Sequence, residues 1–262
     1  MEFAAGGQRV FAGTGGGTFD AALPTAVLLH GAGMNHTVWA LQARALAHHG
    51  RNVLALDFPG HGGSAGPALE TIEALAEWLL HALQTLGVAR FRLAGHSMGS
   101  LVALEAASRA GAACEVLALL GFVPEMRVHR DLLAAARVGA HLASELIVAW
   151  GFGLENLTGG NPAPGIFLPD AALRLIEQTP AASLAADLAA CDRYRGAAAA
   201  ARTVRCPVLL LSGAQDRMTP AARAEAFAGA FVAARGVTLP ACGHMLMVEQ
   251  PVAVLDSLRS IL

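Results

Sequence analysis

The sequence predicts an α/β fold, with a mostly parallel central sheet, helices on both faces of the sheet and an inserted helical cap. Short apolar runs alternate along the chain with longer alanine- and leucine-rich helical patterns, which is typical of a parallel sheet. The runs are continuously apolar, as expected for strands buried on both faces. A length of 262 residues suits one large domain or a domain with an insertion.

Six runs are predicted to be strands because each is short and rich in leucine or β-branched residues. In chain order these runs are Thr25–His30, Arg51–Asp57, Arg90–His96, Cys114–Phe122, Cys206–Gly213 and Gly236–His244. Helical patterns of the core are expected near residues 37–49, 70–86, 98–110 and 252–262. Thr219 followed by Pro220 predicts another helix start, because a hydroxyl can cap the first turn and proline has a suitable fixed φ.

One connection is much longer than the fold requires. Between Gly121 and Pro207 lie 85 residues, whereas a parallel crossover needs only about a dozen or somewhat more. This segment has helical patterns near 130–150, 170–179 and 181–202, and glycines and prolines separate the first two. We therefore predict a core domain in two parts, 1–121 and 204–262, and a helical cap over 122–203.

Composition excludes several classes of protein. Apolar residues make up 55% of the chain and the net charge is −2, which argues against disorder and against a basic surface for nucleic acid. The four cysteines are far apart and form no Cys-x-x-Cys pair, so reduced thiols are expected. No grouping of histidine and acidic residues has metal-ligand spacing, and no dinucleotide-binding pattern is present, so no cofactor is predicted.

The chain also lacks the expected signals for export or membrane insertion. Its first residues have neither the basic start nor the continuous apolar stretch of a signal peptide. The most apolar region, 131–153, is interrupted by Arg137, His141 and Glu145, and a membrane span needs about 20 nearly uncharged residues. A soluble cytoplasmic protein is expected, while its oligomeric state stays open.

Polar motifs fall at the carboxyl ends of the predicted strands, where open parallel sheets bind ligands. His-Gly-Ala-Gly begins at His30, Ser97 follows the third strand, Asp216 follows the fifth, and His244 lies in the last strand-to-helix loop. Gly95 and Gly99 bracket the serine in the stretch "GHSMG". Glycine removes the Cβ atoms that would obstruct a sharp turn, so this pattern predicts an exposed serine at the tip of a strand-to-helix turn.

These motifs resemble the α/β-hydrolase superfamily, and the resemblance extends from Val27 over nearly the whole chain. The family pattern is a Gly-x-Ser-x-Gly elbow, then an acid after a later strand, then a histidine near the end. Asp57–Ser64 also resembles the family's loop after the second parallel strand. The resemblance implies a serine-triad, esterase- or lactonase-like enzyme, with backbone N–H groups of Ala32 and Met98 forming the oxyanion hole.

The residue types suit acyl transfer. A serine hydroxyl becomes a good nucleophile when a base removes its proton, and His244 can do this near neutral pH. Asp216 would accept a hydrogen bond from the other ring nitrogen, which fixes the tautomer and stabilises the imidazolium. Backbone amides at Ala32 and Met98 would stabilise the negative oxygen of the tetrahedral intermediate.

Other residues compete for these roles. Glu125 is the main alternative acid, because some relatives carry the acid after the strand that precedes the cap. Asp187 and Asp192 lie in helical patterns and are expected to be surface charges, and Asp57 is expected to stabilise its own turn. Cys242 is predicted to be a small buried residue. Seven other histidines are predicted to brace turns or face solvent: His30, His48, His49, His61, His96, His129 and His141.

The predicted substrate is a small-molecule acyl compound: a small to medium, largely apolar ester, lactone or thioester. Met34 and Met245 are candidate pocket residues, because they adjoin the oxyanion motif and His244. If Arg127 or Arg130 points inward, a carboxylate-bearing enol-lactone becomes plausible. A carbon–carbon bond hydrolase, an acyltransferase and a ligand-binding protein without turnover are the alternatives.

Overall fold

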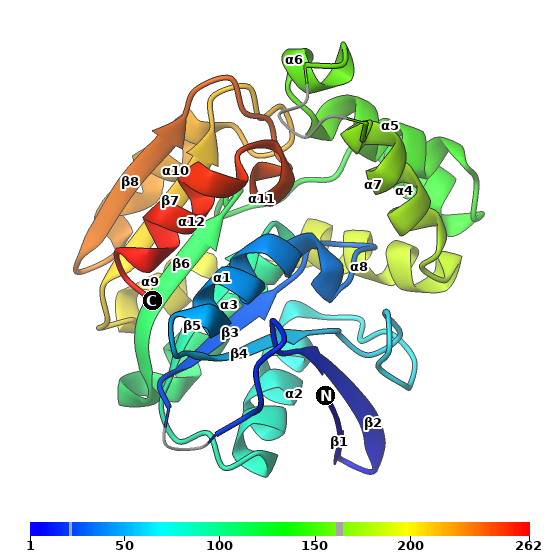
Figure 1. The fold of residues 1–262 in the computed structure, drawn as a ribbon. Coiled ribbons are helices and arrows are strands. Elements are labelled where there is room, and N and C mark those ends of the chain that lie inside the picture. The colour runs from blue at the N-terminus through cyan, green and yellow to red at the C-terminus, as the bar shows by residue number, and fades with distance from the viewer. Residues whose placement is uncertain (21–22, 161–164) are drawn as a thin grey trace.

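The computed structural model describes residues 1–20, 23–160 and 165–262, and it contains a central sheet of eight strands (Figure 1). The strand order is β1-β2-β4-β3-β5-β6-β7-β8, and all neighbours from β4 to β8 are parallel. The strands are β1 Glu2–Ala5, β2 Gln8–Gly13, β3 Thr25–Leu29, β4 Asn52–Leu56, β5 Phe91–His96, β6 Cys114–Leu120, β7 Val208–Gly213 and β8 Ala234–Leu239. The six predicted strands and the parallel sheet are confirmed.

The antiparallel hairpin of β1 and β2 was not predicted. Both strands are short and half exposed at the sheet edge, so their apolar pattern is weak. They meet at Gly6 and Gly7, which have φ values of +59° and +76°. Two glycines with positive φ form the tight hairpin turn that matches strand twist, and this Gly-Gly pair was the available signal.

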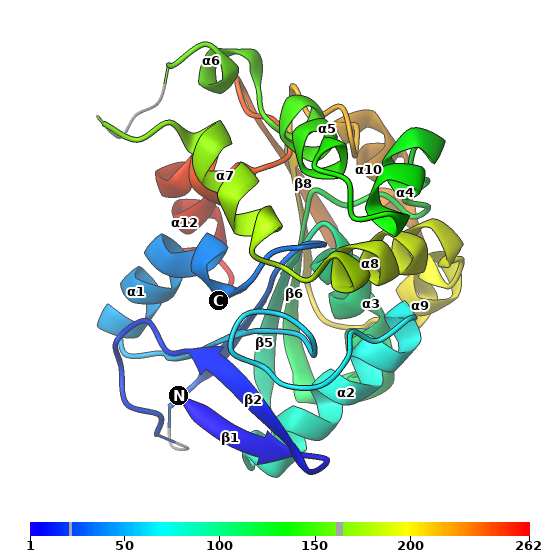
Figure 2. The same ribbon diagram turned by 90° about the vertical axis from the view of Figure 1, so that its right-hand side faces the viewer.

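Helices cover both faces of the sheet, as Figure 2 shows. Helices α2, α3 and α9 pack on one face, and α1 and α12 pack on the other. Side chains alternate between the faces along a strand, and Val27 and Leu28 of β3 accordingly belong to different cores. These helices are α1 Ala40–His48, α2 Ile72–Thr85, α3 Met98–Ala110, α9 Ala197–Thr203 and α12 Pro251–Arg259.

Most of the chain between β6 and β7 forms a helical layer beyond the carboxyl ends of the strands (Figures 1 and 2). Its helices are α4 Arg130–Arg137, α5 Leu142–Gly151, α6 Leu154–Leu157, α7 Leu168–Glu177 and α8 Ala181–Arg193, and α9 follows them. Part of the predicted Gly/Pro-rich segment, residues 161–164, lies outside the described residues. None of the helices in the described ranges combines the length and apolar character needed to cross a bilayer.

Two helices expected in this layer are each divided in two. The pattern over 130–150 is broken near Gly139, which adopts φ +65°, a conformation that interrupts a right-handed helix. The pattern over 181–202 is broken at Tyr194, whose backbone is extended. The buried Tyr194 donates a hydrogen bond from its hydroxyl to Glu105 on α3 at 2.7 Å, and this long-range contact ties the break to the core.

The remaining helical elements are short. They are α10 Ala221–Phe227, α11 Leu246–Glu249, η1 His36–Trp39, η2 Gly111–Ala113 and η3 Ala228–Ala230. Helix α10 begins at Ala221, with Pro220 as its N-cap and no side-chain cap. The predicted cap at Thr219 is therefore wrong, because that hydroxyl is hydrogen-bonded elsewhere, as described below.

Candidate active site

Ser97 lies at the turn between β5 and α3 with φ +53°, a region that non-glycine residues rarely adopt. A Cβ on Gly95 would lie 2.0 Å from the carbonyl oxygen of Gly99, and one on Gly99 would lie 2.5 Å from that of His30. The expected reason for the two glycines is confirmed: the turn has no room for side chains there. The backbone of Ser97 is held in this conformation by its N–H, which donates to the carbonyl of Leu120 at 2.9 Å.

Asp216 and His244 lie in contact, although 28 positions separate them in the chain. The Nδ1 atom of His244 is 2.8 Å from Oδ2 of Asp216, and the two side chains are 2% and 0% exposed. With Asp216 ionised, a ring that holds a single proton carries it on Nδ1, and Nε2 is then the acceptor nitrogen. This is the tautomer that a general base requires.

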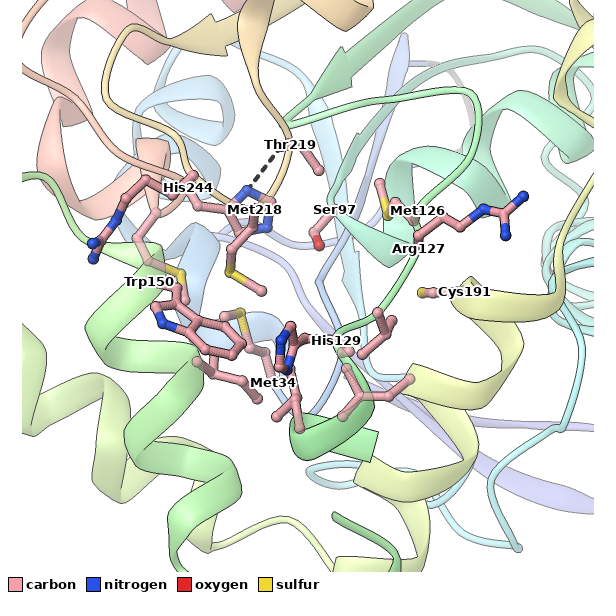
Figure 3. Close-up of a pocket in the computed structure, with 17 residues that line it drawn as sticks. Met34, Ser97, Met126, Arg127, His129, Trp150, Cys191, Met218, Thr219 and His244 are labelled. Atoms are coloured by element: carbon pink, nitrogen blue, oxygen red, sulfur yellow. Dashed lines mark hydrogen bonds between the residues drawn. The ribbon is translucent and has the colours of Figure 1, made fainter. Parts of the chain in front are cut away.

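Thr219 completes this group and was missed as a site residue. Its hydroxyl lies 2.5 Å from Oδ2 of Asp216 and 3.0 Å from Nδ1 of His244, the contact dashed in Figure 3. The other carboxylate oxygen, Oδ1, accepts the backbone N–H groups of Met218 and Thr219. The local sequence Asp-Arg-Met-Thr carried this signal, since Asp side chains commonly bind amides two and three positions on.

The electrostatics keep Asp216 ionised. Burial opposes the charged form, but the nearby charge of His244 and hydrogen bonds from His244 and Thr219 outweigh it and lower the pKa of Asp216 below its ordinary value of 3.8. Glu125, the alternative acid, is exposed and pairs with Arg127 at 3.2 Å. The structure thus brings Asp216 and not Glu125 to the histidine.

Of the two residues expected to supply the oxyanion-hole amides, one directly follows the serine and the other lines the same cavity. Met98 is the first residue of α3, and N–H groups in the first turn have no partner within their own helix. Ala32 lines the same cavity as Ser97. Its neighbour Gly33 is held at both polar atoms, because its N–H donates to Asp187 and its carbonyl accepts the Thr179 hydroxyl, each at 2.9 Å.

A cavity of about 600 Å³ opens over these groups and is lined by Ser97 and His244. Figure 3 shows both side chains facing the cavity, with Met34, His129 and Trp150 on the side opposite Thr219. The candidate residues Met34 and Met245 both line it. Its walls are mainly apolar and come from the helical layer and the core; they include Leu132, Ile147, Leu188, Met126, Met218 and Cys191.

The basic residues Arg127 and Arg130 of the helical layer differ in whether they reach the cavity. Arg127 lines the cavity, but Figure 3 shows its guanidinium directed away from Ser97. Arg130 is 92% exposed and pairs with Asp131. His129 has the structural role that was expected, because its Nδ1 atom accepts the N–H of Asp131 at the start of α4. Its ring also lines the cavity, 5.4 Å from that of Trp150.

Asp187 is not a surface charge, so that expectation is wrong. It is buried in α8 and lies 2.9 Å from Nε2 of His61 in the loop after β4. The helical pattern around it gave no signal of this contact, because His61 is 126 positions away. Asp192 accepts the N–H of Val128 at 3.0 Å, and Asp57 accepts the N–H of Gly63 within its own turn, as expected.

Other buried groups support the loops around the site. His30 accepts the N–H of Phe58, and His96 contacts the carbonyl of His244 at 2.8 Å, so both brace turns as expected. Burial and neighbouring histidine charge lower the pKa of His30 and of His96 to about 3, so both rings are neutral near pH 7. Cys242 is buried, as predicted. His48 and His49 are exposed, also as predicted.

Glu249 is a second buried carboxylate that sequence reasoning missed. Its Oε1 atom accepts the N–H groups of Gly243 and Met245, which flank His244, at 3.1 and 3.0 Å. Its Oε2 atom accepts the N–H of Gly153 at 2.8 Å and the side-chain amide of Asn156 at 3.0 Å. Within the described residues, no group of three or more histidine, cysteine or acidic side chains has the arrangement of a metal site.

The chain is similar to known proteins in both sequence and structure. A family model described as the alpha/beta hydrolase family matches residues 26–257. The chain is 33% identical over 248 residues to pimeloyl-(acyl-carrier protein) methyl ester esterase of Aromatoleum aromaticum, covering 87% of this chain and 94% of that protein. A structure of the enol-lactonase from Burkholderia xenovorans matches with a TM-score of 0.89 and 25% identity, covering 100% of this chain and 99% of that one.

One curated relative is considerably longer than this chain. The dihydrolipoyllysine-residue acetyltransferase component of the acetoin cleaving system of Pseudomonas putida is 31% identical over 241 residues. That match covers 85% of this chain but 59% of the relative. The chain therefore corresponds to a part of that protein.

Proposed function

Because this chain belongs to the alpha/beta hydrolase family, we propose that it is a serine hydrolase cleaving a small to medium, largely apolar carboxylic ester, lactone or thioester. The observation that carries the proposal is the 2.8 Å contact between His244 and Asp216 at the wall of the cavity that Ser97 also lines. Hydrolysis is the chemistry of the family, whereas the nucleophile and the substrate class are our proposal.

In the proposed mechanism, Oγ of Ser97 attacks the substrate carbonyl while Nε2 of His244 takes the hydroxyl proton. The N–H groups of Ala32 and Met98 stabilise the negative oxygen of the tetrahedral intermediate. His244 then gives its proton to the departing alcohol or thiol, which leaves an acyl group on the serine. A water molecule, deprotonated by the same histidine, releases the acid and restores the serine.

We further propose that the helical segment 122–203 acts as a cap that supplies most of the substrate-binding wall. Leu132, Ile147 and Leu188 from this segment give the cavity its apolar character. An apolar wall favours a substrate whose acyl group lacks charge, since an unpaired carboxylate would lose its hydration there. The outward direction of Arg127 supports the same choice over a carboxylate-bearing lactone.

Steady-state hydrolysis of p-nitrophenyl acetate and butyrate tests the function. We expect multiple turnovers that fall by about 10⁴-fold or more in Ser97→Ala. Ser108→Ala is the matched control, because Ser108 lies on the same helix α3, outside the lining of the cavity, and its hydroxyl donates to the carbonyl of Glu105. Unchanged turnover in Ser97→Ala would exclude this serine as the nucleophile. A single acylation without turnover would instead favour the ligand-binding alternative.

A further inference from the structure

A second cavity of about 400 Å³ adjoins the catalytic cavity. Met34 and Met245 line both cavities, so these two side chains form the wall between them. The second cavity lies between α7 of the helical segment and the core elements η1 and α11. It has no part in the mechanism described above.

The lining of the second cavity is suited to a hydrocarbon. Its apolar lining includes Val38, Leu168, Ala172, Leu175, Met247 and Val248. Among the described residues that line it, Arg174 alone is charged, and it pairs with Asp170 one helical turn away at 3.1 Å. Ile166 and Phe167, just before Leu168, are large exposed apolar side chains. The apolar surface therefore continues to the start of α7.

The wall between the cavities consists of side chains that can move without the backbone. Methionine is unbranched, has three rotatable bonds and adapts to the shape of its neighbours. Met34 and Met245 are both buried and are the residues fixed next to the oxyanion loop and the catalytic histidine. A change of rotamer at either position would therefore join the two cavities close to the reacting atoms.

We propose that the second cavity is a subsite for an unbranched hydrocarbon chain of the substrate, admitted when Met34 and Met245 change rotamer. This inference rests on the proposed serine-hydrolase function and adds the class of substrate: esters with a long unbranched aliphatic chain. The chain can belong to the acyl group or to the alcohol, and the experiment separates these two sources.

The proposal predicts how rate depends on chain length. Each methylene group buried in an apolar site raises kcat/KM by about threefold to fourfold when its transfer energy is fully used. With the subsite open, kcat/KM should keep rising from butyrate to decanoate in a p-nitrophenyl ester series. A parallel series of alkyl acetates, followed by acid release, reports the same dependence for a chain on the alcohol side.

Three variants test the location of the subsite. Ala172→Phe places a ring in the second cavity and should lower the ratio of kcat/KM for decanoate to that for butyrate by about tenfold or more, as expected when several methylenes lose their site. Met34→Ala removes part of the wall and should raise the same ratio. Ala182→Phe is the matched control, since this exposed position lines neither cavity, and it should leave the ratio unchanged.

The outcomes separate this inference from the proposed function. No hydrolysis of butyrate would contradict the serine-hydrolase function itself. The subsite alone would be overturned if butyrate is hydrolysed and Ala172→Phe leaves the ratio of kcat/KM for long to short chains unchanged in both the p-nitrophenyl ester series and the alkyl acetate series. A crystal structure of the protein inhibited by a decyl phosphonate is an independent test. The decyl group lies beside Leu175 and Val248 if the proposal holds, and beside Leu132 and Ile147 if it is wrong.

Discussion

Asp187 and His61 form a buried contact that joins the helical segment to the core, with Oδ2 of Asp187 2.9 Å from Nε2 of His61. Both side chains are 1% exposed. The same carboxylate oxygen accepts the N–H of Gly33, the residue after the proposed oxyanion donor Ala32. Through one oxygen atom, helix α8 thus holds the loop after β3 and the loop after β4 in fixed positions.

Asp187→Asn tests whether this contact positions the oxyanion loop. The substitution keeps the shape but removes the charge that pairs with His61, so the loop should be less firmly held. We expect kcat to fall by about tenfold, with a smaller change in KM, because the oxyanion develops only in the transition state. Asp192→Asn on the same helix is the control, since Asp192 binds the N–H of Val128. An equal loss of kcat in both variants would argue against a role of Asp187 in positioning the oxyanion loop.

The same pair predicts a pH dependence of stability. Burial disfavours the charged imidazole, but the charge of Asp187, its hydrogen bond and the more distant Asp57 raise the pKa of His61 above its ordinary value of 6.5. The contribution of protonated His61 to the free energy of unfolding is therefore fully present below pH 6.5. It is lost as pH rises through the raised pKa that His61 has in the folded state. Urea unfolding should show a larger difference in unfolding free energy between the native chain and His61→Gln at pH 6 than at pH 9. A difference independent of pH would contradict it.

Gly121 is predicted to be sensitive to substitution because it lies against His244, the proposed catalytic histidine. It has φ +57°, and a Cβ there would lie 3.0 Å from Cε1 of His244. Gly121→Ala should displace the ring and lower kcat for p-nitrophenyl butyrate by about tenfold to a hundredfold, as small misplacements of reacting groups do. Gly87→Ala is matched in backbone conformation, with φ +73° and nothing within 4 Å of the added atom. It should lower the melting temperature and leave kcat intact; similar kcat values for both variants would refute the steric argument.

Glu249→Gln should destabilise the loop that carries His244. One carboxylate oxygen becomes an NH2 group that faces two N–H donors, so buried hydrogen bonds are lost at about 1–3 kcal/mol. Thermal unfolding should therefore occur at a lower temperature, and kcat should fall with it because Gly243 and Met245 flank the histidine. Glu155→Gln, at an exposed position of α6, is the control and should change neither quantity. A melting temperature unchanged in Glu249→Gln would show that the carboxylate is dispensable.

The sequence by itself determined the features that depend on neighbours along the chain. Alternating apolar runs predicted the parallel sheet, and Gly95 and Gly99 predicted the turn at Ser97. The crowding at Gly95 is local, because a Cβ there would meet the carbonyl of Gly99, whereas a Cβ on Gly99 would meet the carbonyl of the distant His30. The order of the serine, acid and histidine motifs likewise follows from where strands end. The Gly-Gly signal for the first hairpin was equally local, although its short edge strands made the pattern weak.

Only the tertiary structure decided which distant groups meet. The motif order favoured Asp216 over Glu125 as the acid, but only the folded chain shows Asp216 in contact with His244. No local pattern shows that Asp187 is buried, because an aspartate in a helical pattern faces solvent unless a partner from elsewhere offsets its desolvation. His61 and Gly33, 126 and 154 positions away, supply that partnership. The separation of the two cavities by Met34 and Met245 has the same origin, since their shared wall arises where the loops after β3 and β8 pack together.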